Sequence, residues 1–159
     1  PLLFLVYINY LPECALYSKT FLFADDTKCL ASSNGYASSE GLQHDLNSLS
    51  IWCSSNHMSF NNSKSVIVRF PSGFTLPNYF LNLSPITVLP STRDLGIVLS
   101  NDLSWSEHIH HITSKAYKML GLIRRSFSRS IPVATKKMLY ISLVRLHLLY
   151  CSFIWRLLL

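Results

Sequence analysis

The pattern of apolar residues changes near Asn101, and this change limits the possible folds more than any other feature of the sequence. After it, apolar residues recur at helical spacing, at Ile109, Ile112, Ala116, Leu120 and Ile123. This spacing predicts an amphipathic helix. Pro132 suits the first position of a second helix, which carries Leu139, Leu143, Leu146 and Tyr150. The last third of the chain is therefore expected to be helical.

Before Asn101, short strands are expected. Phe21–Ala24, Asp25-Asp26 and Thr27–Leu30 are predicted to form a strand, a two-residue turn and a second strand. The β-branched run Ser65–Phe70 predicts another strand, and Leu95–Leu99 is a further candidate. Between residues 71 and 90 only short strands or hairpins fit, because the stretch is interrupted by Pro71, Gly73, Pro77, Pro85 and Pro90.

One helix is expected within this first part, from about Ser39 to Ser55. Its apolar stripe consists of Leu42, Leu46, Leu49 and Cys53, with Trp52 beside it. Ser38 or Ser39 is expected to cap its start, and Asn56 to end it. Residues 1–9 are apolar and fit either the end of a helix or the start of a strand. The fold class predicted from these elements is α+β.

Charge is distributed unevenly along the chain. Residues 1–100 hold five Lys or Arg and six Asp or Glu, a net charge of −1, whereas residues 101–159 hold nine and two, a net charge of +7. A basic segment of this kind suits a polyanion such as nucleic acid, and a solvated helix surface is the alternative. Apolar residues make up 49% of the chain and charged residues 14%, which argues for a packed core rather than disorder.

Cysteine and histidine give no zinc pattern. Cys14, Cys29, Cys53 and Cys151 form no CxxC pair, and we expect buried, reduced thiols in an intracellular protein. His108, His110 and His111 lie close together, but no nearby cysteine completes a tetrahedral set. No metal is expected at these histidines.

The adjacent carboxylates of Asp25 and Asp26 are the most specific indication of chemistry in the sequence. On a tight turn they would stand together at one end of a hairpin. Mg²⁺ prefers oxygen ligands and usually takes one or two carboxylates together with substrate phosphates, and two such metals can drive nucleotidyl transfer. Aspartate is also a favoured turn residue without any chemistry, so the pair alone leaves both interpretations open.

The surrounding motifs resemble those of reverse transcriptases from non-LTR (LINE-like) retrotransposons. The similarity covers nearly the whole chain, in five motifs that stand in the family's order: Pro1–Asn9 with Leu11-Pro12; Phe23–Thr27; Leu42, Asp45–Asn47, Leu49, Trp52-Cys53, Asn56, Phe60-Asn61 and Lys64; Leu95–Ile97, Asp102-Leu103, Trp105, His108-Ile109, Ile112, Lys115-Ala116, Leu120-Gly121, Ile123 and Arg124; and Tyr140, Leu143–Arg145, Tyr150 and Ile154-Trp155. The resemblance implies a partial polymerase palm over residues 1–100 and a basic, helical thumb-like region over residues 101–159.

The resemblance also implies roles for individual residues. Asp25 would be a principal ligand of the catalytic Mg²⁺, and Asp26 its supporting neighbour. Phe23 and Ala24 would position the primer end. Lys64 would be a general acid toward the departing pyrophosphate, which requires a site that holds it near the phosphates; a solvated lysine is the alternative.

Nucleic-acid contacts are expected from the thumb-like region, since lysine and arginine bind phosphates without regard to sequence. The candidates are Lys115, Lys118, Arg124, Arg125, Arg129, Lys136 and Lys137. The implied partners are an RNA template, a DNA primer, deoxynucleotide triphosphates and the N-terminal part of the same polyprotein. The implied location is intracellular, in the nucleus or the cytoplasm.

The same resemblance places a further catalytic aspartate and the nucleotide-binding fingers upstream of Pro1. We therefore expect this chain alone not to complete the active site. Tyr10, Leu146 and Leu149 depart from the family pattern, as in a degenerate copy. Two alternatives are a nucleic-acid-binding remnant without catalysis and a membrane-associated protein. The second would use Leu139–Leu159, about the ~20 residues of a span, but Arg145, His147 and Arg156 interrupt this stretch.

Overall fold

A computed structural model of the chain describes residues 2–32, 36–70, 77–127 and 131–155. It is an α+β protein, as predicted from the sequence. Two compact units are formed, one by Pro1–Ile67 and Gly73–Leu89 and the other by Val68–Ser72 and Pro90–Leu159. The division thus falls before the Ser91–Ser100 segment, which groups with the helical unit, whereas the sequence placed the boundary after residue 100.

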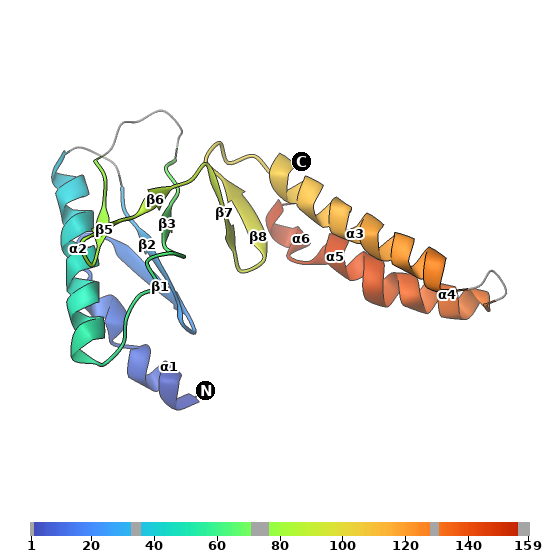
Figure 1. The fold of residues 1–159 in the computed structure, drawn as a ribbon, viewed down its shortest axis with the longest axis horizontal. Coiled ribbons are helices and arrows are strands. Elements are labelled where there is room, and N and C mark those ends of the chain that lie inside the picture. The colour runs from blue at the N-terminus through green and yellow to red at the C-terminus, as the bar shows by residue number, and fades with distance from the viewer. Residues whose placement is uncertain (1, 33–35, 71–76, 128–130, 156–159) are drawn as a thin grey trace. The chain divides into compact units, whose positions relative to one another are not determined.

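The first unit begins with helices and a β-hairpin (Figure 1). Helix α1 spans Leu2–Ile8 and is followed by a 3₁₀ turn, η1, at Leu11–Cys14. Strands β1, Lys19–Phe23, and β2, Asp26–Leu30, then pair antiparallel. Only Ile8 of α1 is buried, so nearly the whole of this apolar helix is exposed.

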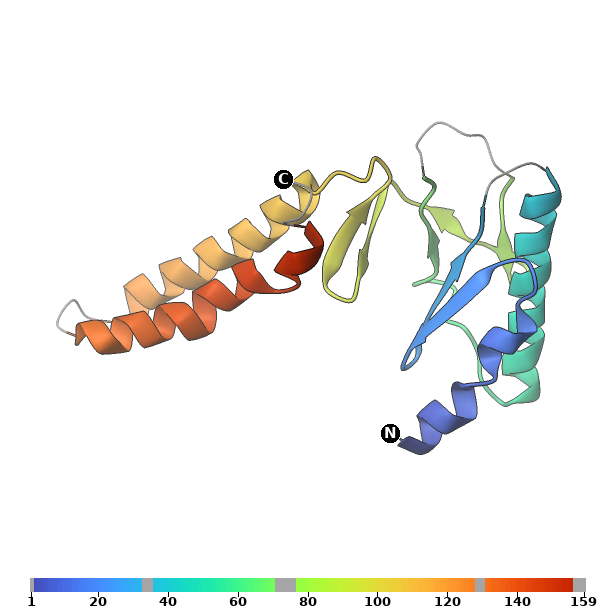
Figure 2. The ribbon, with the colours of Figure 1, turned by 180° about the vertical axis from the view of Figure 1, so that it is seen from behind.

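Helix α2, Tyr36–Ser55, supplies the first core. Leu49 and Cys53 are buried together with Ile8 and Leu11, and side chains of the hairpin pack against this cluster. Figures 1 and 2 show α2 lying alongside the strands of this unit. The helix ends at Ser55, as expected from Asn56. It begins before Ser38 and Ser39, so the predicted cap was wrong: both serines lie inside the helix.

The rest of the first unit consists of very short strands. Parallel pairing joins β3, Val66–Ile67, to β6, Thr87–Val88, and antiparallel pairing joins β4, Phe80–Leu81, to β5, Ser84–Pro85. The strand predicted over Ser65–Phe70 is therefore much shorter than expected. Residues 71–76 of the proline-interrupted stretch lie outside the described residues.

Gln43 of α2 ties the β4–β5 pair to the helix. Its side-chain amide donates a hydrogen bond to the Phe80 carbonyl oxygen at 2.9 Å and accepts one from the Phe80 backbone N–H at 2.8 Å. One side chain thereby satisfies both backbone groups of the same residue, as a neighbouring strand would. Asn62 adds a hydrogen bond to the Leu81 carbonyl at 3.1 Å.

The second unit contains a β-hairpin and a pair of long helical segments. Strand β7, Ser91–Asp94, pairs antiparallel with β8, Ile97–Ser100. The connecting Leu95 and Gly96 both have positive φ, at 44° and 87°, as a two-residue hairpin turn of type I′ requires. The strand predicted over Leu95–Leu99 corresponds to β8, but it begins two residues later because Leu95 and Gly96 form the turn, and its partner β7 was not predicted.

Helix α3 spans Ser106–Ser126, in agreement with the predicted periodicity. The second predicted helical segment consists of α4, Val133–Leu139, a π-helical stretch η2, Tyr140–Arg145, and α5, Leu146–Leu149. A last helical turn, α6, spans Ser152–Trp155. His108, Ile112 and Ala116 of α3 and Val144 of η2 are the buried residues of this helical pair. Within the described residues, no helix combines the length and apolar character that crossing a bilayer requires.

Candidate functional site

The double-Asp hairpin, Lys19–Leu30, places its turn one residue earlier than predicted. Phe23 pairs with Asp26, so the turn consists of Ala24 and Asp25, and Asp26 is the first residue of β2. Ala24 has a φ of 54°, a left-handed conformation that costs a non-glycine residue about 1–2 kcal/mol. The predicted turn Asp25-Asp26 was therefore wrong by one position, although the hairpin itself is formed.

Both carboxylates lie on the exposed end of the hairpin. Asp25 and Asp26 are exposed, and among the described residues neither makes an ion pair or a side-chain hydrogen bond. Their oxygens are therefore available to a ligand. Mg²⁺ is compatible with such a pair, because it accepts one or two carboxylates and keeps water or phosphate oxygens at its other positions.

The outer face of the hairpin exposes two aromatic side chains beside charged ones. Phe21 and Phe23 are 54% and 63% exposed, and they alternate along β1 with Leu22, which packs against the core of the first unit. Lys28 is the cross-strand partner of Phe21. The residues predicted to position a primer, Phe23 and Ala24, are thus accessible beside the two carboxylates.

Lys64 is not brought into contact with the carboxylates. It lies in a tight turn between Asn61 and Ser65, where its backbone N–H donates to the Asn61 carbonyl at 3.1 Å. Its side chain is exposed, and no ion pair joins it to Asp25 or Asp26 in the described part of the chain. A role as a general acid would need a ligand that reaches both places.

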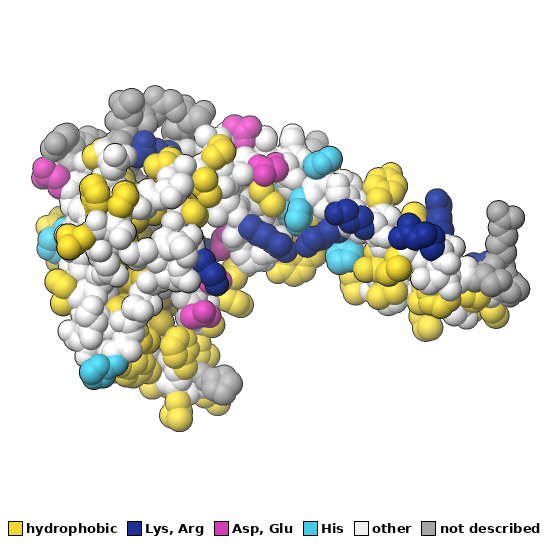
Figure 3. All heavy atoms as spheres, in the orientation of Figure 1, with side chains coloured by type: hydrophobic (Ala, Val, Ile, Leu, Met, Phe, Trp, Pro, Cys, Tyr) yellow, Lys and Arg dark blue, Asp and Glu magenta, His cyan; other side chains and the backbone are white. Residues whose placement is uncertain are grey.

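The predicted nucleic-acid contacts lie on the helical pair of the second unit. Lys118, Arg124 and Arg125 of α3 are exposed and Lys115 is half-buried, whereas Lys136 and Lys137 are exposed on α4. Figure 3 shows Lys and Arg side chains following one another along this unit, with hydrophobic side chains gathered along one edge. Arg129 lies outside the described residues.

The histidines of α3 divide into a buried and an exposed group. His108 is completely buried between the rings of Trp105 and Trp155, each with its centroid 6.1 Å away, and its Nδ1 accepts a hydrogen bond from the Val98 N–H at 3.3 Å. Burial, followed by the neighbouring His111, lowers the pKa of His108. His110 is exposed. Within the described residues, no three His, Cys, Asp or Glu side chains are grouped as metal ligands.

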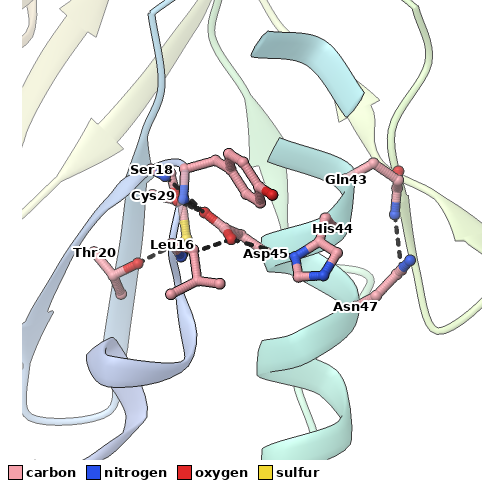
Figure 4. Close-up of polar contacts among 9 residues, drawn as sticks. Leu16, Ser18, Thr20, Cys29, Gln43, His44, Asp45 and Asn47 are labelled. Atoms are coloured by element: carbon pink, nitrogen blue, oxygen red, sulfur yellow. Dashed lines mark hydrogen bonds and ion pairs between the residues drawn. The ribbon is translucent and has the colours of Figure 1, made fainter. Parts of the chain in front are cut away.

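Asp45 is a polar residue whose position the sequence pattern did not reveal. It is fully buried on α2 and accepts four hydrogen bonds: from the backbone N–H groups of Leu16, Tyr17 and Ser18 at 2.8, 2.9 and 2.6 Å, and from the Ser18 hydroxyl at 2.8 Å (Figure 4). Burial raises the pKa of this carboxyl, but the hydrogen bonds outweigh it and hold the pKa below its usual value.

A spacing rule could have found Asp45. Besides Ser39, the buried residues described on α2 follow one another at intervals of four, as Gly41, Asp45, Leu49 and Cys53, so the centre of the buried face includes a glycine and an aspartate. The predicted stripe counted apolar side chains only, and Leu42 and Leu46 are half-buried at its margin. An acidic residue four positions before a buried leucine was the available signal.

Comparison with known proteins identifies no relative of this chain. No protein-family model matches it, and neither a curated protein nor a solved structure does.

Proposed function

We propose that the chain is part of an RNA-directed DNA polymerase of the reverse transcriptase kind. In this proposal the first unit is a portion of the palm and the helical unit a thumb-like element. The double-Asp hairpin contributes two ligands to Mg²⁺, and the helical unit binds the phosphate backbone of an RNA–DNA hybrid. The observation that carries the proposal is the exposure of two adjacent carboxylates, Asp25 in the tight turn and Asp26 at the start of β2, beside two exposed phenylalanines.

The charge distribution supports the same function. A polymerase must move along any template, which requires contacts to phosphates rather than to base edges. Exposed Lys118 and Arg125 lie seven residues apart on α3, and that spacing places them on the same side of the helix. The bound metal would neutralise phosphate charge at the hairpin, and the helical unit would contribute affinity that weakens as salt increases.

The experiment measures metal and nucleic-acid binding separately on the full chain. Mn²⁺ should broaden the amide NMR signals around Asp25 and Asp26, and Asp25→Asn should abolish that broadening. A fluorescent RNA–DNA hybrid should bind with a strong salt dependence. Lys118→Gln should lower the slope of log affinity against log salt by about 0.9, since one phosphate contact is lost, whereas the control Lys19→Gln should leave it unchanged.

Two outcomes would argue against the polymerase. Absence of Mn²⁺ broadening at the turn, with hybrid binding intact, would favour a nucleic-acid-binding protein without catalysis. Within the described residues, no third carboxylate, histidine or cysteine joins Asp25 and Asp26 in a metal-binding group, which makes this the second candidate. Hybrid binding that is insensitive both to salt and to Lys118→Gln would remove the nucleic-acid role. Primer extension by this chain alone is expected to fail with Asp25 or with Asn at that position.

A further inference from the structure

The segment just before β1, Leu16–Ser18, is held by a single side chain. Three consecutive backbone N–H groups point to the Asp45 carboxylate, and the Ser18 hydroxyl donates to it as well. Charge-assisted hydrogen bonds of this kind are about twice as strong as neutral ones. Because Asp45 comes from α2 and β1 starts at Lys19, the carboxylate connects the helix to the base of the double-Asp hairpin.

The register of the double-Asp hairpin depends on where the segment Leu16–Ser18 is held. In a strand, a shift of one residue turns every side chain to the opposite face. In the observed register, Leu22 and Cys29 contact the core that contains Leu49 and Cys53, and Phe21 and Phe23 face outward. A slip at Ser18 would move Leu22 away from that core, and the turn at the far end of β1 would move with it.

Two further contacts limit the position of the segment. Gly41 lies one helical turn before Asp45, and a Cβ atom there would come within 2.7 Å of the Tyr17 Cβ, so the glycine allows the segment to lie directly on the helix. The Tyr17 ring meets His44 edge-on, with centroids 5.4 Å apart. The carboxylate oxygens of Asp45 accept hydrogen bonds from four donors within the chain. Asp45 therefore has a structural role, whereas Asp25 and Asp26 are the proposed metal ligands.

We propose that Asp45 is a positioning residue that fixes the register and location of the double-Asp hairpin on α2, and thereby the place of the Asp25 and Asp26 carboxylates. Its functional meaning rests on the polymerase proposed above, whereas its effect on the hairpin can be measured without it. The neutral isostere Asp45→Asn replaces one acceptor oxygen by a donor that faces other donors. Glu40→Gln, which removes an exposed charge from the same helix, is the matched control.

The test follows amide NMR signals and hydrogen exchange of the full chain. In Asp45→Asn, exchange at Leu16–Ser18 and throughout β1 should accelerate by at least roughly tenfold, a factor that corresponds to about 1.4 kcal/mol, while α3 stays protected. Glu40→Gln should leave the exchange rates at Leu16–Ser18, in β1 and in α3 unchanged. Ser18→Ala, which removes one donor, should act in the same direction but more weakly, and it provides a second variant if Asp45→Asn does not fold.

Acid titration distinguishes positioning by the carboxylate from general packing. In the wild type, the amides of Leu16–Ser18 and of β1 should shift together as Asp45 is protonated, below the usual range of aspartate. The titratable groups beside Asp45 are His44, whose Nδ1 lies 3.7 Å from Asp45 Oδ1, and Cys29 on β2, whose thiol pKa is raised by burial. Asp45→Asn should abolish the coupled shift. Unchanged exchange and an unchanged titration at Leu16–Ser18 and in β1 would overturn the proposal.

Mn²⁺ broadening provides the link to function. If the wild type binds Mn²⁺ at the turn, Asp45→Asn should weaken that binding severalfold. If the wild type binds none, the polymerase proposal fails, and the exchange and titration results still decide whether Asp45 positions the hairpin.

Discussion

The imidazole of His108 accepts a hydrogen bond through Nδ1 from the backbone N–H of Val98, at 3.3 Å. This contact joins the first turns of α3 to β8, and it requires the neutral imidazole. A protonated His108 would present an N–H to the Val98 N–H, and it would place a charge in a completely buried position. The β7–β8 hairpin is therefore held to the helix by a group that acid can convert from acceptor to donor.

Stability is expected to fall as the pH is lowered through the range of histidine. The folded state lowers the pKa of His108, so the unfolded chain binds the proton more readily. The contribution of His108 is thus fully present above about pH 6.5, the ordinary value, and is lost as the pH falls through the lower pKa of the folded state. Urea unfolding between pH 7.5 and 5 measures this slope.

Two substitutions test the assignment of that slope to His108. His108→Asn keeps an acceptor but cannot gain a proton, so the slope should become shallower, while His111, whose pKa burial also lowers, keeps its share. Lost packing should lower the stability of this variant at every pH. His110→Gln changes an exposed histidine on the same helix and should retain the slope. If His108→Asn retains the full slope, another group is responsible.

Gly41 and Gly121 are expected to respond oppositely to alanine. A Cβ at Gly41 would lie 2.7 Å from the Tyr17 Cβ, whereas at Gly121 it would meet only the flexible end of Arg125, at 3.5 Å. Gly121→Ala should stabilise the chain by up to about 1 kcal/mol, because alanine favours the helix interior. Gly41→Ala should destabilise it by about 1–3 kcal/mol, the typical cost of overpacking. Thermal unfolding of the two variants compares them, and stabilisation by both would contradict the close approach of Tyr17 to α2.

Glycine at position 24 is expected to stabilise the double-Asp hairpin. Ala24 has a φ of 54°, which glycine adopts without steric cost. Ala24→Gly should gain on the order of 1 kcal/mol, less the greater entropy of glycine in the unfolded chain. Ala24→Val should be destabilising, since a β-branched residue fits this region poorly. Hydrogen exchange of the β1 and β2 amides measures both effects; faster exchange in Ala24→Gly would count against the strained turn.

Removal of the Gln43 side chain should release β4 from α2. Two hydrogen bonds to Phe80 are lost in Gln43→Ala, at a net cost of about 0.5–1.5 kcal/mol each. Asn47→Ala removes only the 2.9 Å contact between Asn47 and Gln43 and serves as the control. The amides of Phe80 and Leu81 should lose protection in the first variant and keep it in the second. Equal protection in both would show that β4 is held by other contacts.

How far the sequence predicted the fold depends on the kind of interaction that decides each element. Helix α3 was predictable because apolar residues at helical spacing, with Ile112 and Ala116 buried, dominate the face that packs, although that face also buries His108. The double-Asp hairpin was predictable in type, but its turn was displaced because aspartate favours turns locally, whereas the contacts of Leu22 and Cys29 with the core set the actual register. Strand β7 was missed because Ser91–Asp94 is polar and short.

The candidate site shows the same difference. Asp25 and Asp26 are neighbours in the sequence, so their proximity needed no structure. Two other features depend on how separate segments approach each other. One is the position of Lys64 relative to the two carboxylates, and the other is the contact of Asp45 with Leu16–Ser18. Such approaches follow from packing between elements, which residue periodicity does not encode.

Each described sheet has only two strands, and this should favour self-association of the chain in solution. Each described strand is paired with a single other strand, so β1 has an edge along which no further described strand is paired. Such edges can pair with another molecule, and β1 also exposes Phe21 and Phe23 beside its edge. The isolated chain should therefore self-associate as its concentration rises, and dilution or a protein that covers β1 should keep it monomeric.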